Sequence, residues 1–303
     1  HPWITFSVDL RDAPAKLWML LGEACSQCAH IAGVPLRPAT ANELHLVYLT
    51  KGARATTAIE GNTLSEEEVS KLVSGTLDLP PSKEYLGKEV DNILEACNRI
   101  LGDLMQGKSH RLTPRRIREL NGHVLEGLTL EEGVVAGAIR SRPVVVNRYR
   151  GAPAQDCDYL MDRLCTWLDA GEWPIEQLGP MATSILKAVI AHLYVAWIHP
   201  FGDGNGRTAR MIEFQMLVSS GVPSPAAHLL SNHYNETRSE YYRQLDGASQ
   251  TRDPSAFVLY AFQGFVDGLH AQLGLIREQQ WTVAWENYVH GAFRDRNSPA
   301  DTR

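Results

Sequence analysis

The stretch His199-Pro-Phe-Gly-Asp-Gly-Asn-Gly-Arg-Thr-Ala-Arg210 follows one apolar segment, residues 185–198, and runs into a second, residues 207–220. Pro200 ends the first segment, because proline lacks an N–H and restricts the residue before it. A glycine and a proline follow the second segment, as is typical beyond the C-terminal end of a helix. The sequence therefore predicts a helix, a tight glycine-rich turn and the N-terminus of a second helix.

This turn combines the groups that phosphate chemistry requires. A helix N-terminus presents unpaired N–H groups and the positive end of a dipole, so it attracts anions. Arg207 and Arg210 share a helix face, and their guanidinium groups suit phosphate oxygens. Asp203 is a hard oxygen ligand that suits Mg²⁺ on phosphates, and His199 has an ordinary pKa near neutrality, so it can accept a hydroxyl proton. The backbone expected to approach the anion is that of Gly204, Asn205 and Gly206.

Each of these features is usually structural when it occurs alone, since a His-Pro pair, a glycine run and two helical arginines are all common. Together they fix nine positions of the pattern H-P-F-x-D-G-N-G-R-x-x-R. The turn is not a P-loop, because no G-K-[ST] follows it. It is not a dinucleotide-binding loop, because a helix rather than a strand precedes it. The conjunction predicts a site for phosphoryl or nucleotidyl transfer.

The pattern is similar to the core motif of the Fic family of protein adenylyltransferases, with every signature position filled. The resemblance implies transfer of AMP from ATP to a Ser, Thr or Tyr hydroxyl of a target protein, with self-modification included. It implies that His199 is the base, that Asp203 holds Mg²⁺ (or Mn²⁺) and that Arg207 and Arg210 hold the β- and γ-phosphates. Gly206 favours AMP transfer, because relatives with lysine there bind ATP reversed and act as kinases.

Two alternative functions stay open at this point. A phosphodiesterase that removes AMP from a modified protein would use the same residues, with Glu60 positioning or activating a water. A non-enzymatic ATP-binding regulator would not need the base His199, so the complete motif argues against it.

Glu60 forms a second candidate element upstream of the core motif. It falls in the last turn of an expected helix, where the dipole disfavours a carboxylate, so it needs a cationic partner unless it is simply solvated. The pattern Thr56-x-x-x-Glu60-Gly61 is similar to the inhibitory motif, [ST]-x-x-x-E-[GN], of many Fic proteins. The resemblance implies that Glu60 pairs with Arg210 and leaves ATP in an unproductive pose. We therefore expect an autoinhibited enzyme.

Residues 133–153 predict a short β-hairpin in an otherwise helical chain, because β-branched residues there are bounded by turn-forming ones. In the Fic family a hairpin flap lies over the active site, and its exposed edge would pair with the backbone of the target protein. The positions that match the flap strand are Val144, Val145, Val146 and Asn147. The resemblance also places Tyr241 beside the adenine, although an aromatic residue of the core is the alternative.

The composition of the chain narrows its partners. The formal net charge is −6 over 303 residues, which argues against a nucleic-acid partner. No run of about 18 apolar residues is free of charge, so we expect no membrane span. The five cysteines lack the spacing of a disulfide framework, which indicates a cytoplasmic protein.

We expect an all-α Fic fold, a helical bundle with the small hairpin flap over the active site. Capping boxes at residues 40–43 and 65–68 predict that helices begin there. We expect that the chain can form a homodimer. The expected divisions are an N-terminal helical region that carries the inhibitory helix (1–104), a Fic catalytic core (105–268) and a C-terminal helical extension (269–303).

Overall fold

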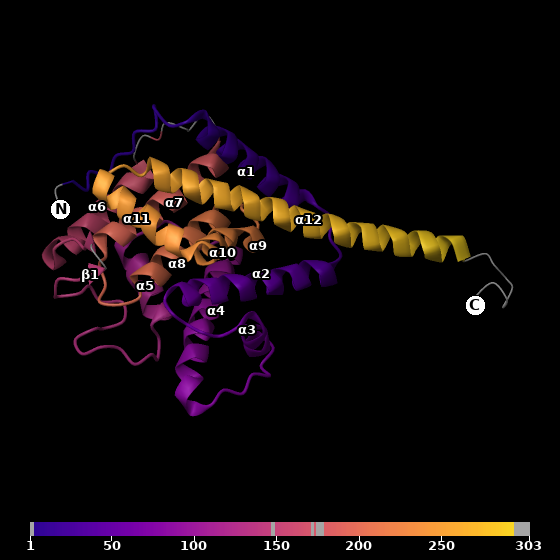
Figure 1. Ribbon diagram of the computed structural model, residues 1–303, viewed down its shortest axis with the longest axis horizontal. Coiled ribbons are helices and arrows are strands. Elements are labelled where there is room, and N and C mark those ends of the chain that lie inside the picture. The colour runs from indigo at the N-terminus through magenta and orange to yellow at the C-terminus, as the bar shows by residue number, and fades with distance from the viewer. Residues whose placement is uncertain (1–2, 147–148, 171–172, 174–178, 294–303) are drawn as a thin grey trace.

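The computed structural model describes residues 3–146, 149–170, 173 and 179–293. Within these ranges the chain is mostly helical, and its long helices lie in three layers (Figure 1). The middle layer holds α7 (Pro180–Ile198) and α8 (Asn205–Ser219). The layer on one side holds α1 (Ala15–Gly33) and α12 (Ser255–Phe293), and the layer on the other holds α2 (Pro38–Ile59) and α4 (Glu84–Met105). This arrangement confirms the expected all-α fold.

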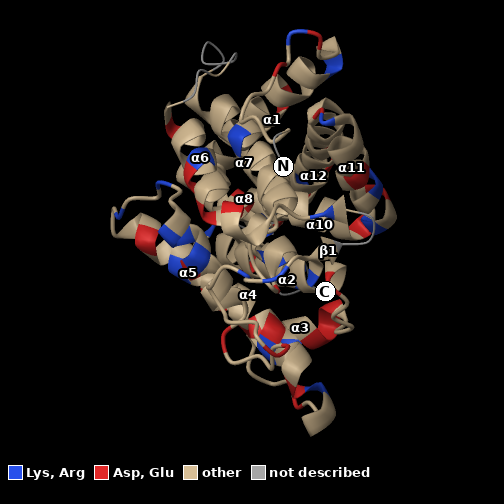
Figure 2. Cartoon of the chain, turned by 90° about the vertical axis from the view of Figure 1, so that its left-hand side faces the viewer, with Lys and Arg blue, Asp and Glu red and all other residues tan. Residues whose placement is uncertain are grey.

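Shorter elements connect these layers and close their ends. The helices among them are α3 (Glu66–Val73), α5 (Pro114–Val124), α6 (Cys157–Ala170), α9 (Ser224–Ala227), α10 (Leu229–Glu236) and α11 (Arg238–Thr251). Two 3-10 turns, η1 and η2, cover Pro81–Lys83 and Ala154–Asp156. Acidic residues gather on α3 and basic residues on α5 (Figure 2).

α7 lies at the centre because it is apolar on every face. Its core residues Ile185, Val189 and Leu193 have no exposed surface. α7 is the one helix in the described ranges that is long and apolar enough to cross a membrane. However, 72% of its apolar stretch is buried inside the protein. The neighbouring helices α1, α6, α8 and α12 all pack on it. α7 therefore provides the hydrophobic core that holds the following turn in place.

α2 packs against α4, α8 and α10 and brings Glu60 to the middle layer. Its start differs from the prediction: α2 begins at Pro38, two residues before the supposed cap at Thr40, because proline at the first helical position loses no hydrogen bond. The second predicted capping box is confirmed, since Ser65 and Glu68 exchange side-chain and backbone hydrogen bonds at the start of α3.

The expected hairpin consists of two short antiparallel strands, β1 (Val145–Val146) and β2 (Tyr149–Arg150). At the open end of the hairpin, the N–H of Gly151 donates to the carbonyl oxygen of Val144 at 3.1 Å. Asn147, predicted as part of the flap, lies outside the described residues. An isolated bridge pairs Ile139 with Phe201, so the segment that leads to the flap is tied to the core-motif turn.

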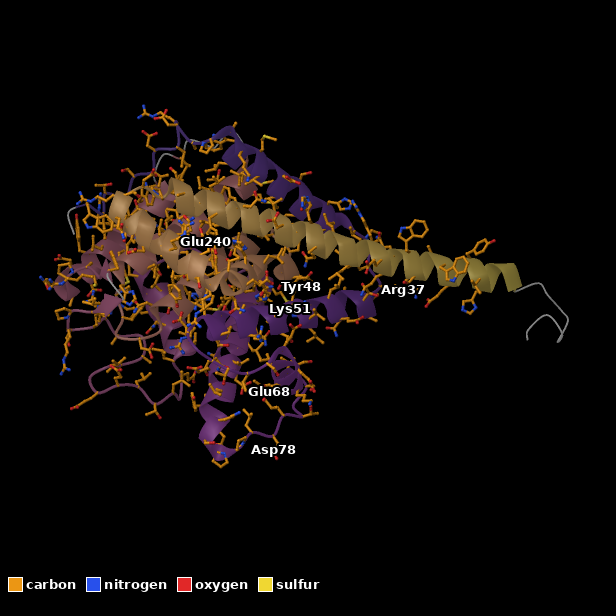
Figure 3. All side chains as sticks on the ribbon, viewed as in Figure 1. Arg37, Tyr48, Lys51, Glu68, Asp78 and Glu240 are labelled. Atoms are coloured by element: carbon orange, nitrogen blue, oxygen red, sulfur yellow. The ribbon has the colours of Figure 1, made fainter. Side chains whose placement is uncertain are left out.

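α12 continues without interruption across residues 268 and 269, where the catalytic core was expected to end. Its N-terminal part packs on α1 and α10, and Ile276 is the last of its residues described as buried. Beyond that point α12 projects from the body (Figure 1), and Arg37 at the start of α2 lies near it (Figure 3). The division into three regions stays a prediction.

Candidate active site

The turn between α7 and α8 is held by its own side chains. His199 caps α7 in the left-handed conformation, with φ 51° and ψ 60°, and its N–H donates to Val195 at 2.8 Å. The Asn205 side chain accepts from the N–H of Phe201 and donates to its carbonyl oxygen, both at 2.9 Å. Because Asn205 thus closes the loop, it presents its backbone rather than its amide to an anion. The predicted turn and helix N-terminus are both present.

Gly204 and Gly206 permit this compact geometry for different reasons. Gly204 precedes α8 with φ 75°, a conformation that side chains disfavour. Gly206 lies in the first turn of α8, and a Cβ there would lie 2.2 Å from the Glu60 Oε1 atom. The first turn of α8 is therefore open to a negatively charged group, and in this structure that group is the Glu60 carboxylate.

Arg210 is buried and pairs with the predicted partner. Its Nη2 atom donates to Glu60 Oε1 at 2.5 Å and to the Thr56 carbonyl oxygen at 2.9 Å. Gly61, which follows, has a φ of 105°, so it turns the chain away from the end of α2. Thr56 and Glu60 thus contact Arg210 and Gly61 follows them, while their inhibitory role stays a prediction. Thr56 contributes its carbonyl oxygen, and its buried hydroxyl has no hydrogen-bond partner within the described part of the chain.

Arg207 has two acidic partners, of which the sequence indicated neither. Its Nη2 atom lies 3.0 Å from Asp203 Oδ1, and its Nη1 atom lies 3.3 Å from Glu89 Oε1 on α4. The Nε atoms of Arg207 and Arg210 and the Nη1 atom of Arg210 are buried and have no hydrogen-bond partner among the described residues. These donors remain available to a phosphate.

Burial and neighbouring charges determine the protonation states of Glu60 and His199. Burial opposes the ionised form of Glu60, but the nearby cations of Arg210 and Arg207 outweigh it and lower the pKa of this carboxyl group. Burial, and to a smaller extent the cation of Arg140, lower the pKa of His199 to about 4, although a hydrogen bond to the Ala196 backbone acts in the opposite direction. At neutral pH Glu60 is therefore an anion and His199 a neutral imidazole.

A cavity of about 420 Å³ opens beside these groups. His199, Gly206 and Glu60 form one end of it, and residues of α11 form the other. Tyr241 lines the cavity, as predicted for a residue beside a nucleotide base, and its hydroxyl pairs with His192 Nε2 at 2.9 Å. Its ring stacks on Tyr234 and the residue is 2% exposed, so it belongs to the core, which was the alternative. Its place beside an adenine stays a prediction.

Several wall residues were not identified from the sequence. The α11 side contributes Ser239, Tyr242, Leu245 and Asp246, and the α7 side contributes Trp197. The flap contributes Tyr149, whose hydroxyl donates to the Trp197 carbonyl oxygen at 2.5 Å. Of the predicted flap residues, Val144 is half-buried and Val145 is exposed, and both lie on the first side of the hairpin.

Asp203 fits a role as a metal ligand only together with a substrate. Its side chain is 48% exposed, and Oδ1 accepts from the Gly204 N–H and from Arg207. Within the described ranges no group of three or more His, Cys, Asp or Glu side chains could hold a metal ion by itself. Mg²⁺ commonly binds through one carboxylate plus substrate phosphates, so a single aspartate beside an anion site suits it.

The structure is thus an all-helical protein in which the N-terminus of α8, a setting that attracts anions, lies beside a neutral histidine. The sequence profile of the Fic/DOC family matches residues 111–217. A protein adenylyltransferase fic-1 of Caenorhabditis briggsae is 28% identical over 75% of this chain and 42% of its own length. The same-named protein of Caenorhabditis elegans is 30% identical over 73% of this chain and 41% of its own length. The chain belongs to the Fic/DOC family, and it spans about two fifths of the length of these curated relatives.

Solved structures agree on the fold. Fic-1 from Caenorhabditis elegans superposes with a TM-score of 0.70 at 23% identity, over 88% of this chain and 74% of that one. A Fic family protein from Desulfovibrio desulfuricans gives a TM-score of 0.69 at 21% identity, over 86% of this chain and 75% of that one. The layered helices around α7 are therefore the Fic fold.

Proposed function

We propose that the chain is a protein adenylyltransferase that moves AMP from ATP to a Ser, Thr or Tyr hydroxyl, and that Glu60 restrains it. One observation carries the proposal: a single cavity holds the neutral His199 and the N-terminus of α8, and Glu60 there neutralises Arg210. The names of the curated nematode relatives support the reaction class.

The chemistry follows from the positions of these groups. His199 accepts the proton of the target hydroxyl, whose oxygen attacks the α-phosphorus of ATP. A bond forms between that oxygen and phosphorus, the bond from phosphorus to the bridging oxygen breaks, and pyrophosphate leaves. The N–H groups of the first turn of α8 and the Arg207 guanidinium stabilise the negative charge on the phosphates. Asp203 would hold Mg²⁺ or Mn²⁺, which supplies further neutralisation of that charge when bound.

Restraint by Glu60 has a direct electrostatic cause. Its carboxylate occupies Arg210 Nη2, and it stands in the opening that Gly206 leaves at the first turn of α8. A γ-phosphate needs the same guanidinium and carries the same sign of charge as Glu60. The two anions therefore compete, and ATP binds productively only when Glu60 moves away.

We place the target protein along β1, where an extended segment would add a strand to the flap and present its hydroxyl toward His199. Tyr149 of the opposite strand lines the cavity, which supports this placement. The exposed side chain of Val145 would then lie beside the incoming segment.

The test is label transfer from ATP that carries the label on either the α- or the γ-phosphate. Wild type, Glu60→Gly and Glu60→Gly/His199→Ala are compared, with self-modification as the readout. We expect transfer from the α-position alone, strong in Glu60→Gly and absent in the double variant. Transfer from the γ-position would indicate a kinase. If a pre-modified target instead loses AMP, and Glu60→Gly abolishes that loss, the enzyme is a phosphodiesterase.

A further inference from the structure

Arg140 is a buried cation with an unusual set of partners. Its side chain is 7% exposed, and within the described residues it forms no ion pair with a carboxylate. It donates instead to three backbone carbonyl oxygens, with Nε to His199 at 2.7 Å, Nη1 to Arg142 at 2.8 Å and Nη2 to Ala152. A guanidinium group has rigid, planar donors, so bonds in three directions fix the relative positions of their acceptors.

These three carbonyls belong to parts of the chain that the proposed reaction must bring together. His199 carries the base, Arg142 leads into β1, and Ala152 follows β2. Backbone hydrogen bonds run parallel to the side-chain ones, from Arg140 N to the Pro200 oxygen at 3.0 Å and from Ala152 N to the Ile198 oxygen at 3.2 Å. Arg140 therefore lies at the junction of the flap and the turn that carries the base.

Gly151 shows how closely the parts are fitted at this junction. A Cβ at position 151 would lie 3.0 Å from both the Arg140 Nη2 atom and the His199 Cβ atom. The chain at Gly151, just beyond β2, therefore lies too close to His199 and Arg140 to accommodate a side chain without a shift. His199 has a left-handed backbone that is uncommon for a residue with a side chain, and such conformations persist only where the surroundings impose them.

We propose that Arg140 is a positioning residue, which holds the backbone of His199 and both ends of the flap in one geometry so that the base faces the hydroxyl of the docked target. This inference rests on the proposed transfer reaction. Arg140 is not among the described residues that line the cavity. It acts through His199 and the flap, so its loss affects the transfer step and leaves the arginines of the phosphate site in place.

The cation of Arg140 has a second, electrostatic effect on the base. The charged groups that act on His199 are Arg140 from the segment before the flap, Glu60 from α2 and Asp203 from the turn. The two carboxylates favour a protonated imidazole, whereas Arg140 disfavours it. Burial is the larger cause of the low pKa of His199, so removal of Arg140 raises this pKa from about 4 toward 6.5 without reaching it.

The experiment uses the Glu60→Gly protein as the parent, so that restraint by Glu60 does not mask the effect. Arg140→Gln and Arg140→Lys are compared with the matched control Arg142→Gln, which keeps the backbone carbonyl that Arg140 uses. Four quantities are measured: the rate of AMP transfer, the Kd of a non-hydrolysable ATP analogue, the NMR titration midpoint of the His199 imidazole and the hydrogen exchange of the Ala152 amide. Thermal unfolding checks that each variant is folded.

We expect both Arg140 variants to transfer AMP more slowly, on the order of 100-fold for Arg140→Gln, because small displacements of a positioned base are that costly. In both variants analogue binding should stay within threefold and the Ala152 amide should exchange faster. The His199 midpoint should rise in Arg140→Gln, which loses the cation, while Arg142→Gln resembles the parent. Three results would overturn the proposal. The Arg140 variants could keep their transfer rate, they could lose no more of it than Arg142→Gln does, or they could lose it only because they bind the analogue more weakly. If the parent transfers no AMP, the proposed function fails. The NMR midpoint and the amide exchange then still decide the role of Arg140, because unchanged values refute it.

Discussion

Glu60 reaches Arg210 because position 206 has no side chain. The resemblance to Fic proteins gave one reason for Gly206, namely the direction in which ATP binds. The structure adds another, since a Cβ at this position would lie 2.2 Å from the Glu60 carboxylate. Gly206 therefore leaves the first turn of α8 open to Glu60 and, in the proposed reaction, to a competing phosphate.

A first prediction concerns Gly206→Ala. The added methyl group should displace the Glu60 side chain and leave the buried Arg210 without its acidic partner, at a cost of about 2 kcal/mol in unfolding free energy. In a Glu60→Gly background the same change should cost nothing, since alanine favours a helix over glycine. Urea unfolding of the two single variants, the double variant and wild type measures this coupling. If Gly206→Ala lowers the unfolding free energy equally with and without Glu60, the alanine does not act by displacing the Glu60 side chain.

His228 provides a prediction on pH. It is buried against Phe214, and burial, followed by the nearby His45, lowers its pKa to about 3. The folded protein therefore binds this proton more weakly than the unfolded chain does. Protonation of His228 therefore costs no unfolding free energy above about pH 6.5. Below that value the unfolding free energy declines by about 1.4 kcal/mol per pH unit as the pH falls toward 3.

The measurement is the unfolding free energy of wild type and His228→Gln between pH 7.5 and 4. The variant should be less stable at pH 7.5, because glutamine packs less well against Phe214. It should also show a shallower decline below pH 6.5. Parallel curves for the two proteins would show that His228 does not cause the acid sensitivity.

At the scale of whole elements, the proposed restraint of the site depends on α2, because Glu60 caps its C-terminal end. α2 packs on α10, and a Cβ on Gly52 of α2 would lie 2.2 Å from Nδ1 of His228, the residue that precedes α10. The imidazole ring is rigid and buried, so it cannot yield as a flexible side chain does.

Gly52→Ala should therefore push α2 away from its neighbour. We expect a loss of about 1–3 kcal/mol in stability from overpacking, together with increased AMP transfer because Glu60 shifts with its helix. The matched control is Gly22→Ala in α1, where a Cβ meets no atom within 4 Å and the change should stabilise by about 0.5–1 kcal/mol. Thermal unfolding and label transfer check both variants. A Gly52→Ala protein as stable and as restrained as wild type would refute this role of the contact.

Local sequence patterns correctly predicted those structural features that residues close in the chain determine. The turn before α8 and the cap at Ser65 are of this kind. The predicted start of α2 was wrong, because Pro38 begins the helix before the capping box that follows it. The partners Glu89 of Arg207 and His199 of Arg140 are 118 and 59 residues away along the chain, so no local pattern indicates them. The pairing of Glu60 with Arg210 was accessible only through the family resemblance, since 150 residues separate them.

At the scale of the molecule, α12 joins the beginning and the end of the described chain, because it packs along α1 in the same outer layer (Figure 1). Its residues before 277 contribute large apolar side chains to the core. The fully or almost fully buried ones are Phe257, Phe262, Phe265, Leu269 and Ile276. The part beyond is different, since Trp281, Trp285 and Tyr288 are 77%, 64% and 67% exposed.

The last prediction follows from this change along one helix. A chain that stops at residue 277 keeps every buried side chain of α12, so its unfolding temperature should stay within about 2 °C of wild type, and its AMP transfer should not change. A chain that stops at residue 260 loses Phe262, Phe265 and Leu269 from the core, at about 2 kcal/mol each. That loss is comparable to the whole stability of a typical domain, so this chain should not fold. Circular dichroism on heating distinguishes the two. A strong destabilisation of the longer chain would mean that the projecting part of α12 supports the fold, against the exposure of its aromatic side chains.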